Sequence, residues 1–97
     1  MSKYSYPAVF TKEEIGFSIV FPDFEACFTQ GDTIEDGISM AEDVLCLTLC
    51  HMEEKKEKIP KPSNPKDIIT DSVSFVTLVQ CDTLKYQKLQ NVDCILS

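Results

Sequence analysis

The sequence predicts an α+β domain in which one helix packs on a face of a mainly antiparallel sheet, in the order strand, strand, strand, helix, strand. Three observations indicate this fold class. Segments before residue 32 carry apolar residues at every second position, a longer segment carries them at helical spacing, and a segment rich in β-branched residues follows a proline-rich stretch. The 97 residues suffice for a single domain.

The first two strands are expected at residues 4–10 and 17–21. In YSYPAVF the positions 4, 6, 8 and 10 share one face, and in FSIVF the apolar positions 17, 19 and 21 do the same. Pro7 cannot donate to a strand ladder, so we expect it at a sheet edge, a strand start or a bulge. The polar stretch ending at Gly16 suits a hairpin connection, and a short third strand is expected at residues 26–29.

A capped amphipathic helix is expected from residue 34 to about residue 53. Either Asp32 or Thr33 serves as the N-cap, since each has a carboxylate three residues later. Apolar residues at positions 34, 38, 41, 45, 49 and 52 form the predicted core stripe, so Ile38→Asp or Leu45→Asp is expected to unfold the chain. Met40 and Leu47 lie farther round the helix, where they either widen the core stripe or meet a second subunit.

The chain divides into a β-β-β-α core at 4–53, a proline-rich linker at 54–72, a last strand at 73–80 and a tail at 81–97. The last strand is expected to be buried on both faces, because apolar residues occupy both sides of SVSFVTLVQ. The tail ends in an apolar pair, Ile95 and Leu96, which either docks on the core or contacts another chain.

The charge balance limits the classes of partner. Nine Lys and sixteen Asp and Glu residues give a formal net charge of -7, which argues against direct binding of nucleic acid. The charge suits a basic protein partner, or simply a soluble acidic surface. No apolar run approaches the roughly 20 residues of a membrane span, and the start does not resemble a secretory signal. Five cysteines match no disulfide framework, so we expect unpaired thiols and a cytoplasmic location.

Candidate chemical sites are weak. Cys46, Cys50 and His51 cluster on the helix but do not converge, so we expect no zinc site and no other cofactor. An alternative is a metal-dependent nuclease that uses Asp23, Asp32 and Asp36, although helix capping and turn formation also explain these carboxylates. No nucleophile motif or phosphate-binding loop is present in the sequence, and no catalytic residues are predicted.

Three stretches follow one another along the chain: YPAVF, GFSIVFPDFEACFTQGDTIEDGISMAEDVLCL and IPKPS. In this order they resemble the HicB family of antitoxins. That family typically has a Tyr-Pro-Ala start, a V-x-F-P-D-L-P-G-C-x-T-x-G-D-T-x-E-E-A motif that enters a helix, and a proline-rich linker. The chain departs from the motif where Glu25 and Ala26 replace Pro-Gly and where Gly37 replaces Ala. The matching residues are Tyr6, Pro7, Ala8, Gly16, Phe21, Pro22, Asp23, Cys27, Thr29, Gly31, Asp32, Thr33, Glu35 and Ala41.

The resemblance implies a single HicB-like domain over residues 1–97 with a partial ribonuclease-H-like fold. It also implies a non-enzymatic antitoxin that forms a homodimer or higher homo-oligomer and masks HicA, a small basic mRNA-cleaving toxin. The alternative is an orphan or truncated dimeric HicB-like domain without an active toxin. Many members continue into a DNA-binding domain, whereas this chain stops at Ser97, so we expect no operator binding by this chain alone.

Two sets of contact residues follow from this hypothesis. The first set, expected to bind the toxin, combines the segment after the second strand with the acidic start of the helix: Phe17, Asp23, Phe24, Glu25, Asp32, Glu35 and Asp36. The second set, expected at the dimer interface, comprises Met40, Leu47, Ile95 and Leu96.

Overall fold

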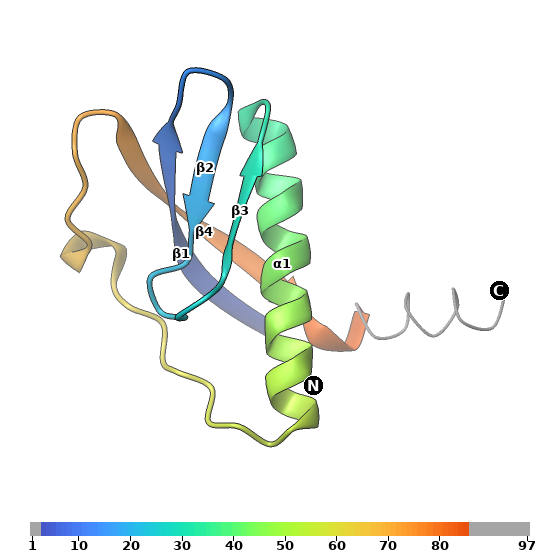
Figure 1. The fold of residues 1–97 in the computed structure, drawn as a ribbon. Coiled ribbons are helices and arrows are strands. Elements are labelled where there is room, and N and C mark those ends of the chain that lie inside the picture. The colour runs from blue at the N-terminus through green and yellow to red at the C-terminus, as the bar shows by residue number, and fades with distance from the viewer. Residues whose placement is uncertain (1–2, 86–97) are drawn as a thin grey trace, which may run out of the picture.

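The computed structural model describes residues 3–85, which form a four-stranded antiparallel sheet with one long helix against it (Figure 1). The strand order is β3-β2-β1-β4. The predicted fold class is therefore confirmed. The elements are β1 (Lys3–Lys12), β2 (Phe17–Val20), β3 (Phe28–Gly31), α1 (Ile34–Glu54), the short 3₁₀ helix η1 (Pro65–Asp67) and β4 (Ser74–Asp82).

Strand β1 holds the sheet together because it pairs with two neighbours. Its second half pairs with β2, and nearly its whole length pairs with β4, from Lys3 opposite Asp82 to Thr11 opposite Ser74. The β1–β2 register includes no residue before Val9. At Pro7, β1 therefore pairs with β4 alone. Because β1 is an inner strand with continuous pairing through Pro7, the expectation of a sheet edge, a strand start or a bulge at this residue is wrong.

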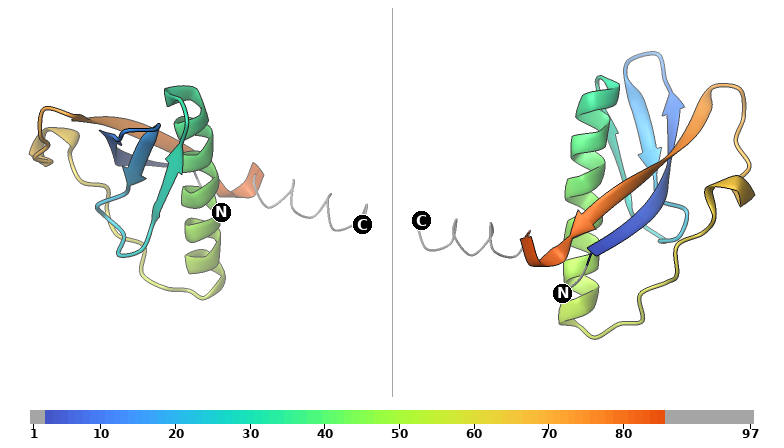
Figure 2. Two further views of the ribbon diagram at one scale, coloured as in Figure 1. Left: turned by 45° about the horizontal axis from the view of Figure 1, so that its top comes forward. Right: turned by 180° about the vertical axis from the view of Figure 1, so that it is seen from behind.

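The core lies between α1 and one face of the sheet. Tyr6, Ala8 and Phe10 of β1 are at most 1% exposed and meet Leu45 and Leu49 of α1, which are fully buried. Figure 2 shows α1 lying against one side of the strands, while the linker returns from the end of α1 to the start of β4. This arrangement brings the linker, the helix and the β2–β3 loop to the same side of the molecule.

Two glycines allow β3 and α1 to approach closely. A Cβ atom added to Gly31 would lie 2.6 Å from the Cα atom of Gly37. A Cβ atom on Gly37 would lie 2.9 Å from Cε2 of Phe10 and 3.1 Å from Cδ1 of Ile19. The first buried turn of α1 therefore packs backbone against backbone on the sheet.

The helix begins as expected but its buried stripe is shorter than predicted. Thr33 is the N-cap, and its Oγ1 atom accepts a hydrogen bond from the backbone N–H of Asp36 at 3.1 Å. Ile34 and Ile38 are 44% and 37% exposed, so their assignment to the buried core is wrong. The sheet contacts the helix from Gly37 and Ala41 onward, and these two isoleucines lie at the margin of that contact.

Two strand predictions also need correction. The third strand begins at Phe28 instead of residue 26, because Phe21 N–H donates to the carbonyl of Cys27 and keeps the preceding residues in a loop. The last strand is not buried on both faces. It is an edge strand of the sheet, where Leu78 is 54% exposed and only Val79 and Cys81 are buried.

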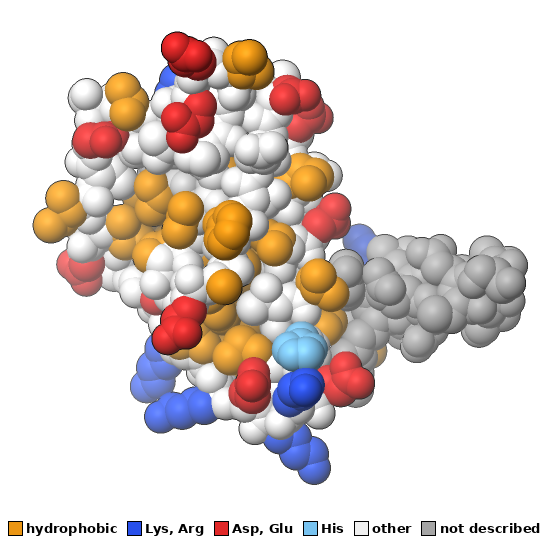
Figure 3. All heavy atoms as spheres, in the orientation of Figure 1, with side chains coloured by type: hydrophobic (Ala, Val, Ile, Leu, Met, Phe, Trp, Pro, Cys, Tyr) orange, Lys and Arg blue, Asp and Glu red, His pale blue; other side chains and the backbone are white. Residues whose placement is uncertain are grey.

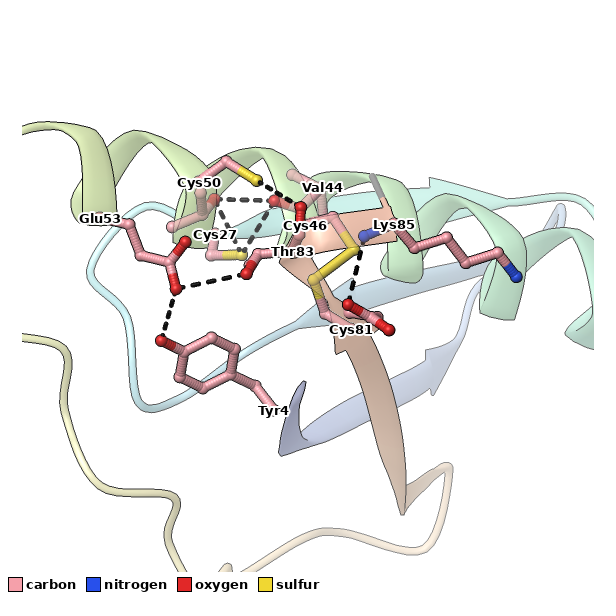
Figure 4. The surroundings of a disulfide bond; sticks show 11 residues. Tyr4, Cys27, Val44, Cys46, Cys50, Glu53, Cys81, Thr83 and Lys85 are labelled. Atoms are coloured by element: carbon pink, nitrogen blue, oxygen red, sulfur yellow. Dashed lines mark hydrogen bonds between the residues drawn. A yellow bond between two sulfur atoms is a disulfide. The ribbon is translucent and has the colours of Figure 1, made fainter. Parts of the chain in front are cut away.

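The end of β4 is attached to α1 by a polar and a covalent connection (Figure 4). Glu53 Oε2 accepts hydrogen bonds from Tyr4 Oη at 2.7 Å and from Thr83 Oγ1 at 3.3 Å. Cys46 and Cys81, whose Cα atoms are 5.4 Å apart, form a disulfide. The expectation of unpaired thiols is therefore wrong for this pair, which the fold brings together across 35 residues of sequence.

The exposure of α1 predicts different effects for two similar substitutions. Leu45→Asp is expected to abolish cooperative unfolding, because it places an unpaired charge at a fully buried position. Ile38→Asp is expected to cost less than about 1.5 kcal/mol, since the side chain reaches solvent. Urea denaturation followed by circular dichroism would measure both, and equal losses of stability would contradict the described helix face.

Acid unfolding is expected to depend on Glu53. Burial raises its pKa, but interactions that favour the charged carboxylate, among them the hydrogen bonds from Tyr4 and Thr83, hold the pKa below its usual value of 4.5. The stabilisation is therefore present above pH 4.5 and is lost as the pH falls through the lower folded-state pKa. In Glu53→Gln, the stability should no longer fall as the pH drops through this pKa. Glu54→Gln changes the exposed neighbour and should show the same loss of stability as the unaltered chain. Parallel curves for both variants would contradict the assignment.

Candidate functional site

A groove opens on the side where the β2–β3 loop, the second half of α1 and the start of the linker meet. Its volume is about 720 Å³. Four of the expected contact residues lie along it, namely Asp23, Phe24 and Glu25 of the loop and Leu47 of α1. The other lining residues are Ala26, Cys27, Thr48, His51, Met52, Glu57, Lys58 and Pro60.

Aromatic stacking fixes the loop wall of this groove. The Phe24 ring lies 4.8 Å from the ring of the buried Tyr6, at an interplanar angle of 57°. Tyr6 Oη donates a hydrogen bond to the carbonyl of Pro60 in the linker. Burial, followed by the nearby Asp23 charge, raises the pKa of Tyr6, so the hydroxyl remains a donor at neutral pH.

Asp23 joins the same loop to the linker. Its carboxylate accepts hydrogen bonds from the backbone N–H of Ser63 at 3.0 Å and from the Ser63 hydroxyl. The two residues are 40 positions apart in sequence. Asp23 therefore has a structural role in shaping the groove, and the sequence pattern did not single out Ser63 as its partner.

The helical wall presents the exposed side chain of Leu47 and contacts the buried thiol of Cys27, which lies at the end of the β2–β3 loop. Leu47 is 59% exposed, while Cys27 is 2% exposed beneath the groove. Thr48 Oγ1 donates to the carbonyl of Val44 at 2.8 Å and lies 3.5 Å from Cys27 Sγ. Burial raises the pKa of the Cys27 thiol despite the opposing effect of the Thr48 hydrogen bond, so this sulfur is suited to packing at neutral pH.

A second candidate surface lies at the opposite end of β2 and β3. Gly16 has φ 74° and packs on the backbone of Gly31, which brings the β1–β2 turn against the start of α1. Figure 3 shows several acidic side chains at this end, at the top of the view. We call it the acidic end, and it comprises the exposed residues Glu13, Glu14, Asp32, Glu35 and Asp36.

Six of the seven expected toxin-binding residues therefore fall into two groups. Asp23, Phe24 and Glu25 lie at the groove, whereas Asp32, Glu35 and Asp36 lie at the acidic end. Phe17 is half-buried at the start of β2, between Phe10 and Phe75, with Lys12 Nζ 5.1 Å from its ring centroid.

The expected dimer contacts are only partly described. Met40 and Leu47 are 45% and 59% exposed on α1, and Leu47 lines the groove. Ile95 and Leu96 lie outside the described residues. Contact of these four residues with a second subunit stays a prediction.

The side chains considered above for metal binding lie apart within residues 3–85. No group of three or more His, Cys, Asp and Glu side chains in this range could hold a metal ion. Asp23 is separated from Asp32 and Asp36 by the length of β3, and the Cys46 sulfur is bonded to Cys81.

Within residues 3–85, no helix is both long enough and apolar enough to cross a membrane.

The Asp23–Ser63 contact predicts a specific change in linker accessibility. Asp23→Ala should cost about 1–3 kcal/mol of stability, because it removes two hydrogen bonds to the linker. It should also speed tryptic cleavage at Lys58 and Lys66, which flank the Asp23–Ser63 contact in the linker. The exposed neighbour Glu25→Ala is the matched control, and equal cleavage rates in the two variants would rule out a role for Asp23 in holding the linker.

Comparison with known proteins gives the chain a family. The family model for the HicB-like antitoxin of the bacterial toxin-antitoxin system matches residues 6–92. Antitoxin HicB 2 of Photorhabdus laumondii is 38% identical over 58 residues, which cover 60% of this chain and 42% of that protein. Antitoxin HicB 1 of the same organism is 44% identical over 50 residues, covering 52% and 32%. The chain thus spans less than half the length of these two relatives.

Solved structures share the fold. A chain of a toxin-antitoxin complex from Streptococcus pneumoniae has a TM-score of 0.77 and 24% identity, with 87% of this chain and 72% of that chain covered. A chain of the HicA3 and HicB3 toxin-antitoxin complex has a TM-score of 0.67 and 26% identity, with 81% and 99% covered. Because the family model spans residues 6–92, the chain belongs to the family of HicB-like antitoxins of bacterial toxin-antitoxin systems.

Proposed function

We propose that this chain is the antitoxin of a type II toxin–antitoxin pair and that it binds and masks a small basic HicA-like toxin that cleaves mRNA. The observation that carries the proposal is the family match over residues 6–92. It is supported by the shared fold with a chain of the HicA3 and HicB3 complex at 26% identity. The toxin itself and its activity are part of the proposal, since the chain spans less than half of its curated relatives.

The proposed mechanism is steric and electrostatic masking. A protein that cleaves RNA needs a basic surface to hold the phosphate backbone. The five carboxylates of the acidic end supply a complementary surface, and the net charge of -7 favours long-range attraction. The groove supplies exposed apolar area at Leu47, beside the half-buried Phe24, which would give the complex its slow dissociation.

The remaining parts of the proposal follow from this role. The chain acts without catalysis of its own, in the cytoplasm, as one HicB-like domain over residues 1–97. It associates with itself as a homodimer or higher oligomer through α1 and the tail. No described feature favours the orphan-domain alternative, so we do not advance it.

The direct test is inhibition of RNA cleavage by the product of the adjacent reading frame. The purified chain is expected to co-purify with that protein and to stop cleavage at stoichiometric ratios. The folded state of the chain is checked by circular dichroism in the same preparation. Undiminished cleavage in an excess of folded chain would overturn the antitoxin proposal.

The acidic end should control the rate of association. The triple variant Asp32→Asn, Glu35→Gln, Asp36→Asn is expected to slow toxin association by about tenfold at low ionic strength, because it removes three attractive charges. The matched control, Glu42→Gln with Asp43→Asn and Glu54→Gln, removes three exposed carboxylates elsewhere on α1 and should change the rate less. Stopped-flow or biolayer measurements at two salt concentrations would decide, and equal effects would exclude a localised acidic contact.

The groove should control the rate of dissociation instead. Leu47→Ala is expected to speed release of the toxin by about tenfold or more if Leu47 fills a pocket of the partner. Because the Leu47 side chain is exposed, the substitution should not unfold the chain, and unfolding would not account for faster release of the toxin. The solution mass of the variant without toxin separates the two hypotheses for Leu47. If this residue is a dimer contact, the substitution should lower the solution mass and leave the rate of toxin dissociation unchanged.

A further inference from the structure

The Cys46–Cys81 disulfide lies at the edge of a second groove. The two residues are 8% and 3% exposed, so the disulfide is packed against the core. Both nevertheless line an open groove of about 610 Å³ between α1 and the paired ends of β1 and β4. The other lining residues are Lys3, Tyr4, Ser5, Glu42, Asp43, Gln80, Asp82 and Lys85.

From this geometry we propose that Cys46 and Cys81 form a thiol–disulfide exchange site for a low-molecular-weight thiol, and that its redox state sets how firmly β4 is held on α1. The groove gives a small thiol a route to the sulfur atoms. Its polar and charged lining suits a hydrophilic thiol. Neither the family nor the proposed masking of a toxin assigns a role to this pair, and the inference does not rest on that function.

The exchange proceeds in two steps whose atoms and electrons balance. The thiolate of one small thiol attacks the sulfur of Cys81, the bond to Cys46 breaks, and Cys46 leaves as a thiolate that takes a proton from water. A second small thiolate then attacks the sulfur of the first, which releases Cys81 as a thiol. The net reaction converts two small thiols and the protein disulfide into one small-molecule disulfide and two protein thiols.

Reduction changes the attachment of β4 because the connections that remain are weaker. In the described residues, the connections between the end of β4 and α1 include the disulfide, the hydrogen bond from Thr83 Oγ1 to Glu53 at 3.3 Å, and a long contact of 3.8 Å from Cys50 Sγ to the carbonyl of Thr83 (Figure 4). Val79 of β4 also packs in the core beside α1. The disulfide spans 35 residues, which include the second half of α1, the whole linker and most of β4. Its cleavage increases the conformational entropy of that long loop in the unfolded state, which lowers the stability of the fold. It also removes the covalent bond between α1 and β4, which is an edge strand.

The test uses the full chain in glutathione buffers of graded reduced-to-oxidised ratio. After equilibration, thiols are trapped by alkylation, and peptide mass spectrometry reports which cysteines were linked. Trypsin places Cys81 alone on the peptide of residues 67–85, whereas Cys27, Cys46 and Cys50 share the peptide of residues 13–55. Fragmentation of the linked peptides then identifies which of these three cysteines is joined to Cys81. We expect the 46–81 linkage to pass from fully formed to fully reduced within the glutathione series, with the mixed disulfide at Cys81 in between.

The second readout is thermal unfolding at each ratio. Full reduction is expected to lower Tm by about 10–20 °C, as for the loss of a native disulfide in a domain of this size. Cys50→Ala, one helical turn from Cys46, removes the contact with Thr83 and should lower the starting Tm slightly. As a control it should still keep both the 46–81 linkage and the shift in Tm with glutathione. Cys46→Ser should have a low Tm that no longer responds to glutathione. If that variant does not fold, the redox series of the unaltered chain decides alone.

Three results would overturn the proposal. The first is a 46–81 linkage that never forms under oxidising conditions, or a pairing of Cys81 with another cysteine. The second is a linkage that persists even in fully reduced glutathione, since the groove would then give no small thiol access. The third is complete reduction without a change in Tm, which would show that the bond does not hold β4 on α1.

Discussion

The antiparallel pairing of β1 with β4 is the contact on which the rest of the molecule depends. It joins the first strand to the last, from Lys3 opposite Asp82 to Thr11 opposite Ser74. All the other elements, including α1, lie between these two strands in the sequence. Such a contact is entropically costly to form, because nearly the whole described chain lies between its partners. Once it exists, β1 is a central strand, and its buried residues can accept the helix on one face.

The candidate binding groove is a consequence of this closure. Its two loop segments, the β2–β3 loop and the linker, are held together by Asp23 with Ser63 and by Tyr6 with Pro60. Neither segment has a regular strand or long helix to stiffen it, and prolines in the linker restrict its unfolded conformations instead. A partner that binds here therefore meets a surface whose shape depends on contacts some forty or more residues apart in sequence.

Local sequence patterns predicted most of the fold. They failed where contacts between residues far apart in the sequence determine which side chains are buried. Alternation located β1 and β2 because one face of each is buried, and Thr33 capped α1 through a contact three residues away. Periodicity could not show that the sheet leaves Ile34 and Ile38 exposed, since that depends on where β3 meets the helix.

The same limit applies to the candidate site. Spacing could not pair Cys46 with Cys81, and no sequence rule links Asp23 to Ser63. The motif around residues 21–36 indicated the family because its members share these local signals in order. It could not show that the two expected groups of toxin contacts lie at opposite ends of β3, or that Asp23 is engaged within its own chain.

The close approach of Gly37 to the sheet has an evolutionary consequence. The family motif carries Ala at this position, and helix propensity alone would favour Ala over Gly. In this chain the added methyl group would clash with the side chains of Phe10 and Ile19. Both side chains are fully buried, so they have no open space into which they could move. Substitutions at these three positions should therefore be correlated among relatives: a larger residue at 37 should accompany a smaller one at 10 or 19, and the lineage of this chain is confined to glycine until one of them changes.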